Sequence, residues 1–215
     1  MSMNFIRRKI IRFRDLIVNI YMYRHFSINP NNKINWDRKL SKFGNFWRNE
    51  NYRHILNLLP KNKAFSLLDV GCALGDGCGL LQNEFPKVAI TGIDISSVGI
   101  KKAKQKNKKI NYFVLDILKT DLPGIYDYIT IIQTLEHFDN PFSIIDKLLK
   151  HVKKSIIISV PYTLGITGKI DKDVHRYSFN ENTFIGTRYN YRIVEVTDFI
   201  KSTGSKCIIF EFFPN

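Results

Sequence analysis

Apolar and polar positions along this 215-residue chain separate short buried segments from amphipathic ones. Five runs rich in valine, isoleucine and leucine have the length and composition of strands that are buried on both faces. These runs span residues 65–70, 88–94, 110–116, 126–133 and 155–161. Helix-compatible stretches, such as residues 76–84, lie between them. This order predicts an α/β domain with a mainly parallel sheet flanked by helices.

The N-terminal part of the chain lies outside this alternation and predicts a helical extension. Residues 5–23 carry apolar side chains at helical spacing, with arginines on the opposite face. Such a helix either packs on the domain as a lid or lies on a membrane surface as a peripheral contact. Residues 46–59 predict a second helix, directly before the first strand. We therefore divide the chain into a basic extension, residues 1–50, and a domain, residues 51–215.

The C-terminal pattern does not decide how many strands complete the sheet. Ser178 and Glu181 fit a capping box, which predicts a helix beginning one residue after Ser178. Residues 194–203 predict another helix, and residues 206–213 predict a sixth strand. A seventh strand is then either absent or supplied irregularly by residues 192–196. An uncovered sheet edge can be covered by a second copy, so a monomer and a homodimer both stay open.

Composition describes a soluble globular protein, because 44% of the residues are hydrophobic and 24% are charged. No stretch of the sequence is long and apolar enough to predict a transmembrane helix. The three cysteines, Cys72, Cys78 and Cys207, are odd in number and lack the spacing of metal ligands. We therefore expect a reducing, cytoplasmic environment. The sequence shows no cluster of metal ligands, so we expect no metal site, and magnesium held by the paired acids stays open as the alternative.

Positive charge is concentrated near the N-terminus. The net charge is +14, and residues 1–63 contain fourteen lysines and arginines against three acids. Such a segment attracts phosphate esters, nucleic acid or an anionic membrane face. No appended RNA-binding module accompanies it, which argues against RNA, and we expect no DNA partner. The charge is best matched by a small anionic molecule.

The first apolar run ends in a glycine-rich turn that reads Asp69-Val70-Gly71-Cys72-Ala73-Leu74-Gly75. Gly71 can take a positive φ and bring the backbone close to a ligand, and Gly75 lets the next helix start close to the strand. Ala73 replaces a middle glycine, which is tolerable if its φ is negative. A dinucleotide fingerprint needs Gly-x-Gly-x-x-Gly and fails at Ala73 and Asp76. The turn therefore argues against NAD.

Acids follow the next two runs as well. Asp94 ends the second run about twenty residues beyond the glycine turn, the spacing at which a carboxylate meets ribose hydroxyls. Asp116 ends the third run, and the fourth leads through Gln133 into Leu135-Glu136-His137. Because parallel strands end at one edge of their sheet, these groups are expected around one ligand.

Together these features resemble the class I S-adenosylmethionine (SAM) methyltransferases, over roughly residues 51–177. The glycine turn resembles their motif I, acid-x-Gly-x-Gly-x-Gly, and Leu135-Glu136-His137 resembles their segment after strand four. The resemblance implies a Rossmann-like fold, SAM as cofactor and S-adenosylhomocysteine as product. It implies that Asp116 contacts the adenine amino group and that Ile117 packs on the ring. The implied cofactor-binding residues are Asp69, Gly71, Cys72, Ala73, Gly75, Asp94, Ile95, Asp116, Ile117 and Gln133.

The helix before the first strand bears on the same site. Trp47 and Tyr52 lie on it and either line the mouth of the cofactor site or pack in the core.

The segment His175-Arg176-Tyr177-Ser178-Phe179 resembles family members that methylate small molecules, including sugar and polysaccharide-pathway enzymes. Its loop follows the fifth strand, so we expect Tyr162, Arg176 and Tyr177 to contact the acceptor. An alcohol acceptor must lose a proton, and an imidazole titrates near neutral pH. His137 and His175 are therefore the candidate catalytic bases. Each histidine also has a purely structural alternative. His137 would then only support the cofactor pocket, and His175 would hydrogen-bond a nearby backbone group and order its loop.

We thus expect a SAM-dependent methyltransferase that acts on a small, anionic acceptor. A nucleotide-linked or phosphorylated sugar of surface-polysaccharide synthesis is the leading candidate. The amphipathic N-terminus favours a lipid or quinone precursor instead, and the net charge favours RNA. Outside the enzymes, the alternative is a non-catalytic SAM-binding protein on the same fold.

Overall fold

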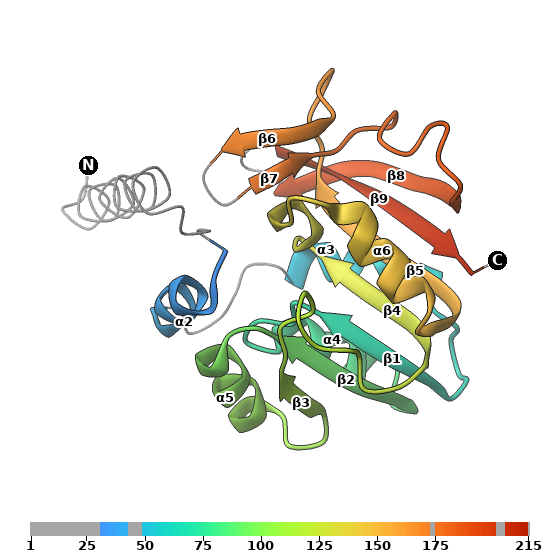
Figure 1. Cartoon of the computed structure of the whole chain (residues 1–215). Coiled ribbons are helices and arrows are strands. Elements are labelled where there is room, and N and C mark those ends of the chain that lie inside the picture. Colours follow the sequence, from blue (N-terminus) through green and yellow to red (C-terminus); the bar gives the residue numbers. More distant parts are fainter. Residues whose placement is uncertain (1–30, 43–48, 173–174, 201–204, 215) are drawn as a thin grey trace, which may run out of the picture.

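A computed structural model describes residues 31–42, 49–172, 175–200 and 205–214. The predicted helix of residues 5–23, and Trp47, lie outside these described residues. The described part is built on a seven-stranded sheet of order β3-β2-β1-β4-β5-β9-β8 (Figure 1). Its strands are β1 (Phe65–Val70), β2 (Val88–Asp94), β3 (Asn111–Val114), β4 (Tyr126–Ile132), β5 (Val152–Pro161), β8 (Asn190–Ile200) and β9 (Ser205–Phe213).

The first five strands are parallel, and β9 pairs antiparallel with both β5 and β8. This confirms the predicted mainly parallel sheet with a Rossmann-like arrangement. All five predicted apolar runs are strands, although β3 ends at Val114, two residues before Asp116. The carboxyl ends of β1, β2 and β4 point toward the same edge of the sheet, on the left in Figure 1.

Helices cover both faces of the sheet. One face carries α3 (Asn49–Ile55), the 3₁₀ turn η1 (Leu56–Leu58), α4 (Asp76–Glu84) and α5 (Ser97–Lys106), and α6 (Pro141–Leu149) covers the other. Successive strand residues serve opposite faces, so Leu67 packs toward α3 and α4 whereas Leu68 packs toward α6. Full burial of each such side chain contributes about 1.5 to 3 kcal/mol. The predicted helix of residues 46–59 begins, among the described residues, at Asn49.

The C-terminal predictions were partly wrong. Residues 194–203 were expected to be helical, but β8 occupies Asn190–Ile200 and supplies the seventh strand. The predicted helix after Ser178 is also wrong, because a strand, β7 (His175–Ser178), ends there and a series of turns follows. In these turns Asn180 Oδ1 accepts a hydrogen bond from Asn182 N, and Thr183 Oγ1 accepts one from Asn180 N. Such local side-chain bonds compete with helix formation.

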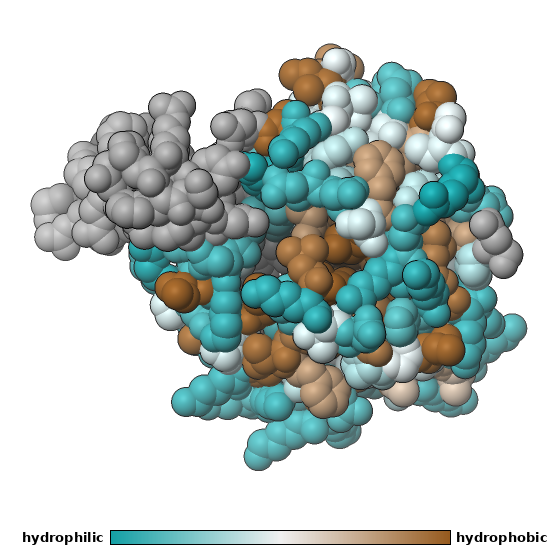
Figure 2. Space-filling model, viewed as in Figure 1, coloured by the Kyte–Doolittle hydropathy of each residue, from teal (hydrophilic) through white to brown (hydrophobic). Residues whose placement is uncertain are grey.

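Two small elements lie near the carboxyl edge of the large sheet. The hairpin of β6 (Gly168–Lys172) and β7 forms a separate two-stranded sheet, and β7 contacts the 3₁₀ turn η2 (Leu135–His137) that follows β4. Helix α2 (Lys33–Ser41) packs on α5. The visible surface is mostly polar and is interrupted by apolar patches (Figure 2). Among the described residues, no helix is long and apolar enough to cross a membrane.

Candidate active site

A cavity of about 830 Å³ lies at the carboxyl edge of the sheet. Its walls come from the ends of β1, β2 and β3, from the segment after β4, and from α2. Six of the ten predicted cofactor residues line it: Gly71, Ala73, Asp94, Ile95, Asp116 and Ile117. The structure thus brings together residues from three strand ends that lie up to 46 positions apart in the sequence.

The glycine turn forms the floor of this cavity. Gly71 has a φ of 74°, and a Cβ atom there would clash with the side chain of Thr134. Gly75, also at 74°, is the N-cap of α4, and a Cβ atom there would lie 2.6 Å from the Tyr112 hydroxyl. The condition stated for Ala73, a negative φ, is not met, because its φ is 50°. The chain therefore keeps a left-handed conformation at this position with a non-glycine residue, which costs on the order of 1 kcal/mol.

Asp94 is held by the backbone at the cavity wall. Its Oδ2 accepts a hydrogen bond from Ala73 N at 2.9 Å, and its Oδ1 accepts one from Ser96 N at 2.8 Å. These bonds fix both carboxylate oxygens between the glycine turn and the start of α5. Each oxygen has a further lone pair, so the carboxylate can also accept bonds from vicinal hydroxyls of a ligand.

Asp116 and Ile117 lie in the turn after β3 and also line the cavity. Asp116 Oδ1 accepts a hydrogen bond from Leu118 N at 3.1 Å, which orients its carboxylate. Ile117 is 6% exposed and belongs to the core on the α6 side. An apolar side chain beside a carboxylate offers a flat, half-polar surface, as a nucleobase requires.

The other four predicted cofactor residues do not line the cavity. Asp69 is fully buried, and its two oxygens lie 2.9 and 2.7 Å from the hydroxyl of Tyr52. Thr130 Oγ1 also donates to Asp69, at 2.8 Å. Tyr52 therefore packs in the core, the second of its two predicted alternatives, and holds Asp69 beneath the glycine turn. Gly75 caps α4, as described above.

Cys72 and Gln133 are also buried behind the cavity wall. Burial raises the pKa of the Cys72 thiol to about 11, so it stays protonated at neutral pH. Gln133 has a φ of 49°, and its Nε2 donates to Ser159 Oγ at 3.3 Å. Both residues support the shape of the turn segments rather than facing the cavity.

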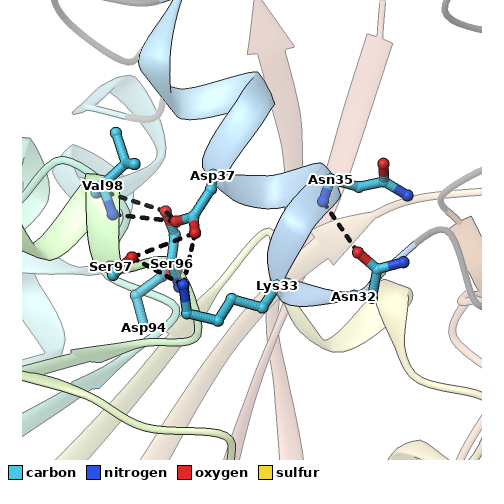
Figure 3. A network of polar contacts seen from close by, with 9 residues as sticks. Asn32, Lys33, Asn35, Asp37, Asp94, Ser96, Ser97 and Val98 are labelled. Atoms are coloured by element: carbon cyan, nitrogen blue, oxygen red, sulfur yellow. Dashed lines mark hydrogen bonds and ion pairs between the residues drawn. The ribbon is translucent and has the colours of Figure 1, made fainter.

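Helix α2 forms a wall that the sequence patterns did not predict. Trp36 and Leu40 of this helix line the cavity, one helical turn apart. Asp37 anchors the helix: its Oδ1 accepts bonds from Ser96 Oγ at 2.6 Å and Val98 N at 3.0 Å, and its Oδ2 pairs with Lys33 at 2.6 Å (Figure 3). A usable signal was present, because Asn32 caps this helix by accepting a bond from Asn35 N.

Electrostatics favour the ionised form of Asp37. Burial alone would raise the pKa of this carboxyl group, but the hydrogen bonds from Lys33, Ser96 and Val98 outweigh that effect. Together they lower the pKa to about 2. The negative charge lies at the N-terminus of α5, where the helix dipole stabilises an anion. The anchor of α2 is therefore fully charged at neutral pH.

The two candidate bases lie together at the edge of the cavity. The rings of His137 and His175 have centroids 5.2 Å apart, although the residues belong to η2 and β7. His137 is 8% exposed and lines the cavity, and the Trp36 ring meets it edge-on at 5.0 Å. Glu136 Oε1 lies 3.8 Å from His137 Nε2. No metal spacing was visible in the sequence, yet the fold joins Glu136, His137 and His175 into one cluster.

The three predicted acceptor contacts lie outside the cavity lining. Arg176 is buried, and its Nε donates to Asp139 Oδ1 at 2.9 Å, which joins β7 to the segment after η2. Tyr177 packs against Phe142 and Phe179 on the α6 side of the sheet. Tyr162 forms a bridge with Phe179, and a hydrogen bond to Glu181 raises the pKa of its phenol. These contacts hold the β7 segment, which carries His175, against its neighbours.

Known proteins resemble this chain in sequence. Residues 45–189 match the family model described as a methyltransferase domain. A malonyl-[acyl-carrier protein] O-methyltransferase of Priestia megaterium is 34% identical over 94 residues, 43% of this chain and 34% of that protein. A ubiquinone biosynthesis O-methyltransferase of Rickettsia akari is 29% identical over 169 residues, 67% of this chain and 66% of that protein. The chain thus spans about one third to two thirds of the length of these curated relatives.

Solved structures share the fold at low sequence identity. The N-methyltransferase NodS from Bradyrhizobium japonicum, solved with S-adenosylhomocysteine, superposes with a TM-score of 0.62 at 18% identity, over 85% of this chain and 97% of that one. Magnesium protoporphyrin IX methyltransferase from Synechocystis, also solved with S-adenosylhomocysteine, gives 0.62 at 17% identity, over 93% and 99% of the two chains.

Proposed function

The chain belongs to the methyltransferase domain family, and on that premise we propose that it binds SAM in the cavity and transfers its methyl group to a small acceptor. The observation that carries this proposal is the carboxylate of Asp94, which the backbone of Ala73 and Ser96 aims at the cavity beside the glycine turn. Two fixed acceptor oxygens match the two vicinal hydroxyls of a ribose.

The remaining cavity residues suit the other parts of the cofactor. We assign the adenine ring to Ile95 and Ile117, with Asp116 as acceptor for its amino group. The cofactor backbone would pass over Gly71, whose missing side chain leaves room there. The sulfonium would then lie toward Thr134 and His137, at the end of the cavity that α2 also lines.

The chemistry needs alignment and one proton transfer. The acceptor oxygen attacks the methyl carbon, the carbon–sulfur bond breaks, and its electron pair stays on sulfur to give S-adenosylhomocysteine. Holding the two reactants in line supplies most of the rate. An alcohol acceptor also loses a proton, and we assign its removal to the His137–His175 pair at this end of the cavity.

For the acceptor, we propose a small anionic molecule, with a nucleotide-linked or phosphorylated sugar as the leading class. The support is the charge: residues 1–63 carry fourteen basic residues against three acids, and Lys33 and Lys119 line the cavity. The malonyl-[acyl-carrier protein] and ubiquinone biosynthesis relatives are both named O-methyltransferases, which favours an oxygen acceptor here. We propose that the reaction takes place in the cytoplasm, where the cysteines stay reduced.

A quinone or lipid precursor is the second candidate, and the cavity rim favours it. Ile34, Val114 and Leu118 line the cavity and are 78%, 49% and 61% exposed. An exposed apolar rim suits an acceptor with an apolar chain better than a sugar phosphate. The two candidates differ in charge and polarity, so acceptor pools of both kinds separate them.

We also propose that residues 1–50 act as a lid. Helix α2 lies within this range and already walls the cavity through Trp36 and Leu40. A lid excludes water from the methyl transfer and completes the binding site. A peripheral membrane contact of residues 5–23 is the alternative, and vesicle binding by a variant lacking residues 1–24 tests it.

The cofactor assignment is tested by ligand binding to the purified chain. S-adenosylhomocysteine should raise the melting temperature and NAD should not, because a ligand that binds only the native state stabilises it. Asp94→Ala should weaken S-adenosylhomocysteine binding by about 100-fold, since hydrogen bonds to a charged acceptor are lost. Asp121→Ala is the matched control, because the Asp121 side chain is 95% exposed and lies outside the cavity lining. Stabilisation by NAD alone would overturn the assignment.

A further inference from the structure

Glu136, His137 and His175 bring three potential metal ligands to one point. One ligand atom from each residue lies within 4.8 Å of the other two. Glu136 and His137 are 2% and 8% exposed, and His175 is half-buried. The residues come from η2 and β7, so the fold rather than local sequence spacing assembles them.

We propose that this cluster binds a divalent first-row metal ion, with zinc as the first choice. Two imidazoles and one carboxylate form the ligand set that suits zinc, manganese or iron better than magnesium. Two ligand atoms of one tetrahedral zinc ion lie about 3.4 Å apart, given metal–ligand bonds of about 2.1 Å. The distance from Glu136 Oε1 to His137 Nε2 is 3.8 Å, and all three ligand atoms lie within 4.8 Å of one another, so side-chain rotations would have to bring them closer to hold the ion.

The two segments that carry the ligands are fastened together. Arg176, next to His175, donates from Nε to Oδ1 of Asp139, two residues after His137. Arg176 is 3% exposed, so the arginine of this ion pair is buried. On the other side, Asn31 Nδ2 donates to the carbonyl oxygen of His137 at 3.0 Å. These contacts hold in place the backbone segments that carry the ligands.

This inference rests on the proposed methyl transfer and changes the role of the two histidines. Three protein ligands would leave a coordination position for an acceptor oxygen, and His137 lines the cavity proposed to hold that acceptor. A metal ion there would lower the pKa of a bound hydroxyl group, whose proton would pass to water. The resulting oxygen would attack the methyl carbon, and the electron pair of the broken carbon–sulfur bond would stay on sulfur. His137 and His175 would then be ligands instead of bases.

Direct metal binding tests the site without reference to turnover. The full chain, first treated with a chelator that is then removed, is titrated with zinc chloride in a calorimeter. We expect one zinc ion per chain and a loss of affinity of more than about tenfold in His175→Ala. His54→Ala is the matched control, because His54 Nδ1 lies 3.3 Å from Glu195 Oε1 in a histidine–carboxylate pair outside the cavity lining. This control should bind zinc like the parent chain.

A second variant guards against misfolding. His175→Cys keeps a zinc ligand at the same position and should recover most of the affinity lost in His175→Ala. Equal zinc affinity in the parent chain and His175→Ala would overturn the metal site, as would no zinc uptake by the parent chain. S-adenosylhomocysteine binding, measured on the same samples, keeps the two proposals apart, because failure of the metal site leaves cofactor binding intact.

Discussion

The carboxylate of Asp37 accepts a hydrogen bond at 3.0 Å from the main-chain nitrogen of Val98, 61 residues further along the chain. Asp37 lies in the middle of α2, and Val98 lies in the first turn of α5. Ser96, which also donates to Asp37, gives its own main-chain N–H to Asp94. One chain of hydrogen bonds thus links the helix that walls the cavity to the carboxylate proposed to hold the ribose (Figure 3).

Asp37→Ala should therefore weaken cofactor binding although Asp37 does not line the cavity. The variant loses charged hydrogen bonds that hold α2 in place, each worth about 1.5 to 3 kcal/mol. If part of that energy is needed to close the wall, S-adenosylhomocysteine affinity falls by about tenfold in calorimetry. Circular dichroism should remain that of the parent chain. Unchanged affinity would mean that α2 closes the cavity without this anchor.

The same anchor predicts a dependence of stability on pH. Because the pKa of Asp37 is lowered to about 2 in the folded chain, the ionised carboxylate stabilises the fold above the ordinary pKa near 3.8. That contribution is lost as the pH falls from about 4 through about 2. In urea melts, the difference in unfolding free energy between the parent chain and Asp37→Asn should be constant above pH 5 and shrink below about pH 4. A difference that stays constant down to pH 2.5 would contradict the lowered pKa.

Gly71→Ala should be much more destabilising than the same change at Gly186. Both glycines have a positive φ, 74° and 73°, so in both alanine variants the left-handed backbone lowers the free energy of unfolding. At Gly71 the new Cβ atom also clashes with Thr134, whereas at Gly186 it meets nothing within 4 Å. The clash should lower the free energy of unfolding of Gly71→Ala by about 1 to 3 kcal/mol more, as measured in urea melts. Equal losses in the two variants would show that Thr134 moves aside freely.

The parts of the fold that local sequence dictates were predictable. Strands β1 and β2 match their predicted bounds, since each is a short run of mainly apolar residues that a turn follows. Asp94 was predicted to lie at the cavity from its distance to the glycine turn. Such features depend on a few neighbouring residues, so residue composition and spacing are enough to predict them.

The missed features depend on tertiary structure. Strand β8 is an edge strand whose register shifts between Ile193 and Glu195, and this irregularity breaks the alternation that would have identified it. The positive φ of Ala73 is imposed by the turn that delivers its N–H to Asp94. His137 and His175 were both predicted to lie at the carboxyl edge of the sheet, but their ring contact, and the cluster with Glu136, need β7 to pack against η2, which no local pattern records.

His137→Ala should lower the turnover number by about 100-fold or more, because either general-base catalysis or metal activation of the acceptor would be lost. S-adenosylhomocysteine affinity should change by less than about tenfold, since His137 lines the end of the cavity that we propose for the acceptor. The measurement is steady-state kinetics with the identified acceptor, beside calorimetry. His151→Ala is the control, because His151 is half-buried and its Nδ1 bonds the carbonyl oxygen of Gly124, away from the cavity lining. It should keep full turnover.

Three outcomes for His137→Ala separate its three roles. If His137 only buttresses the cofactor pocket, S-adenosylhomocysteine binding falls with turnover, which would contradict a role in the reaction. If His137 is the base, cofactor binding persists and added zinc leaves the variant as slow as before. If it is a metal ligand, the two remaining ligands bind the ion more weakly, so a higher zinc concentration restores part of the turnover. Full activity in both His137→Ala and His175→Ala would mean that the enzyme accelerates the reaction only by aligning the two reactants.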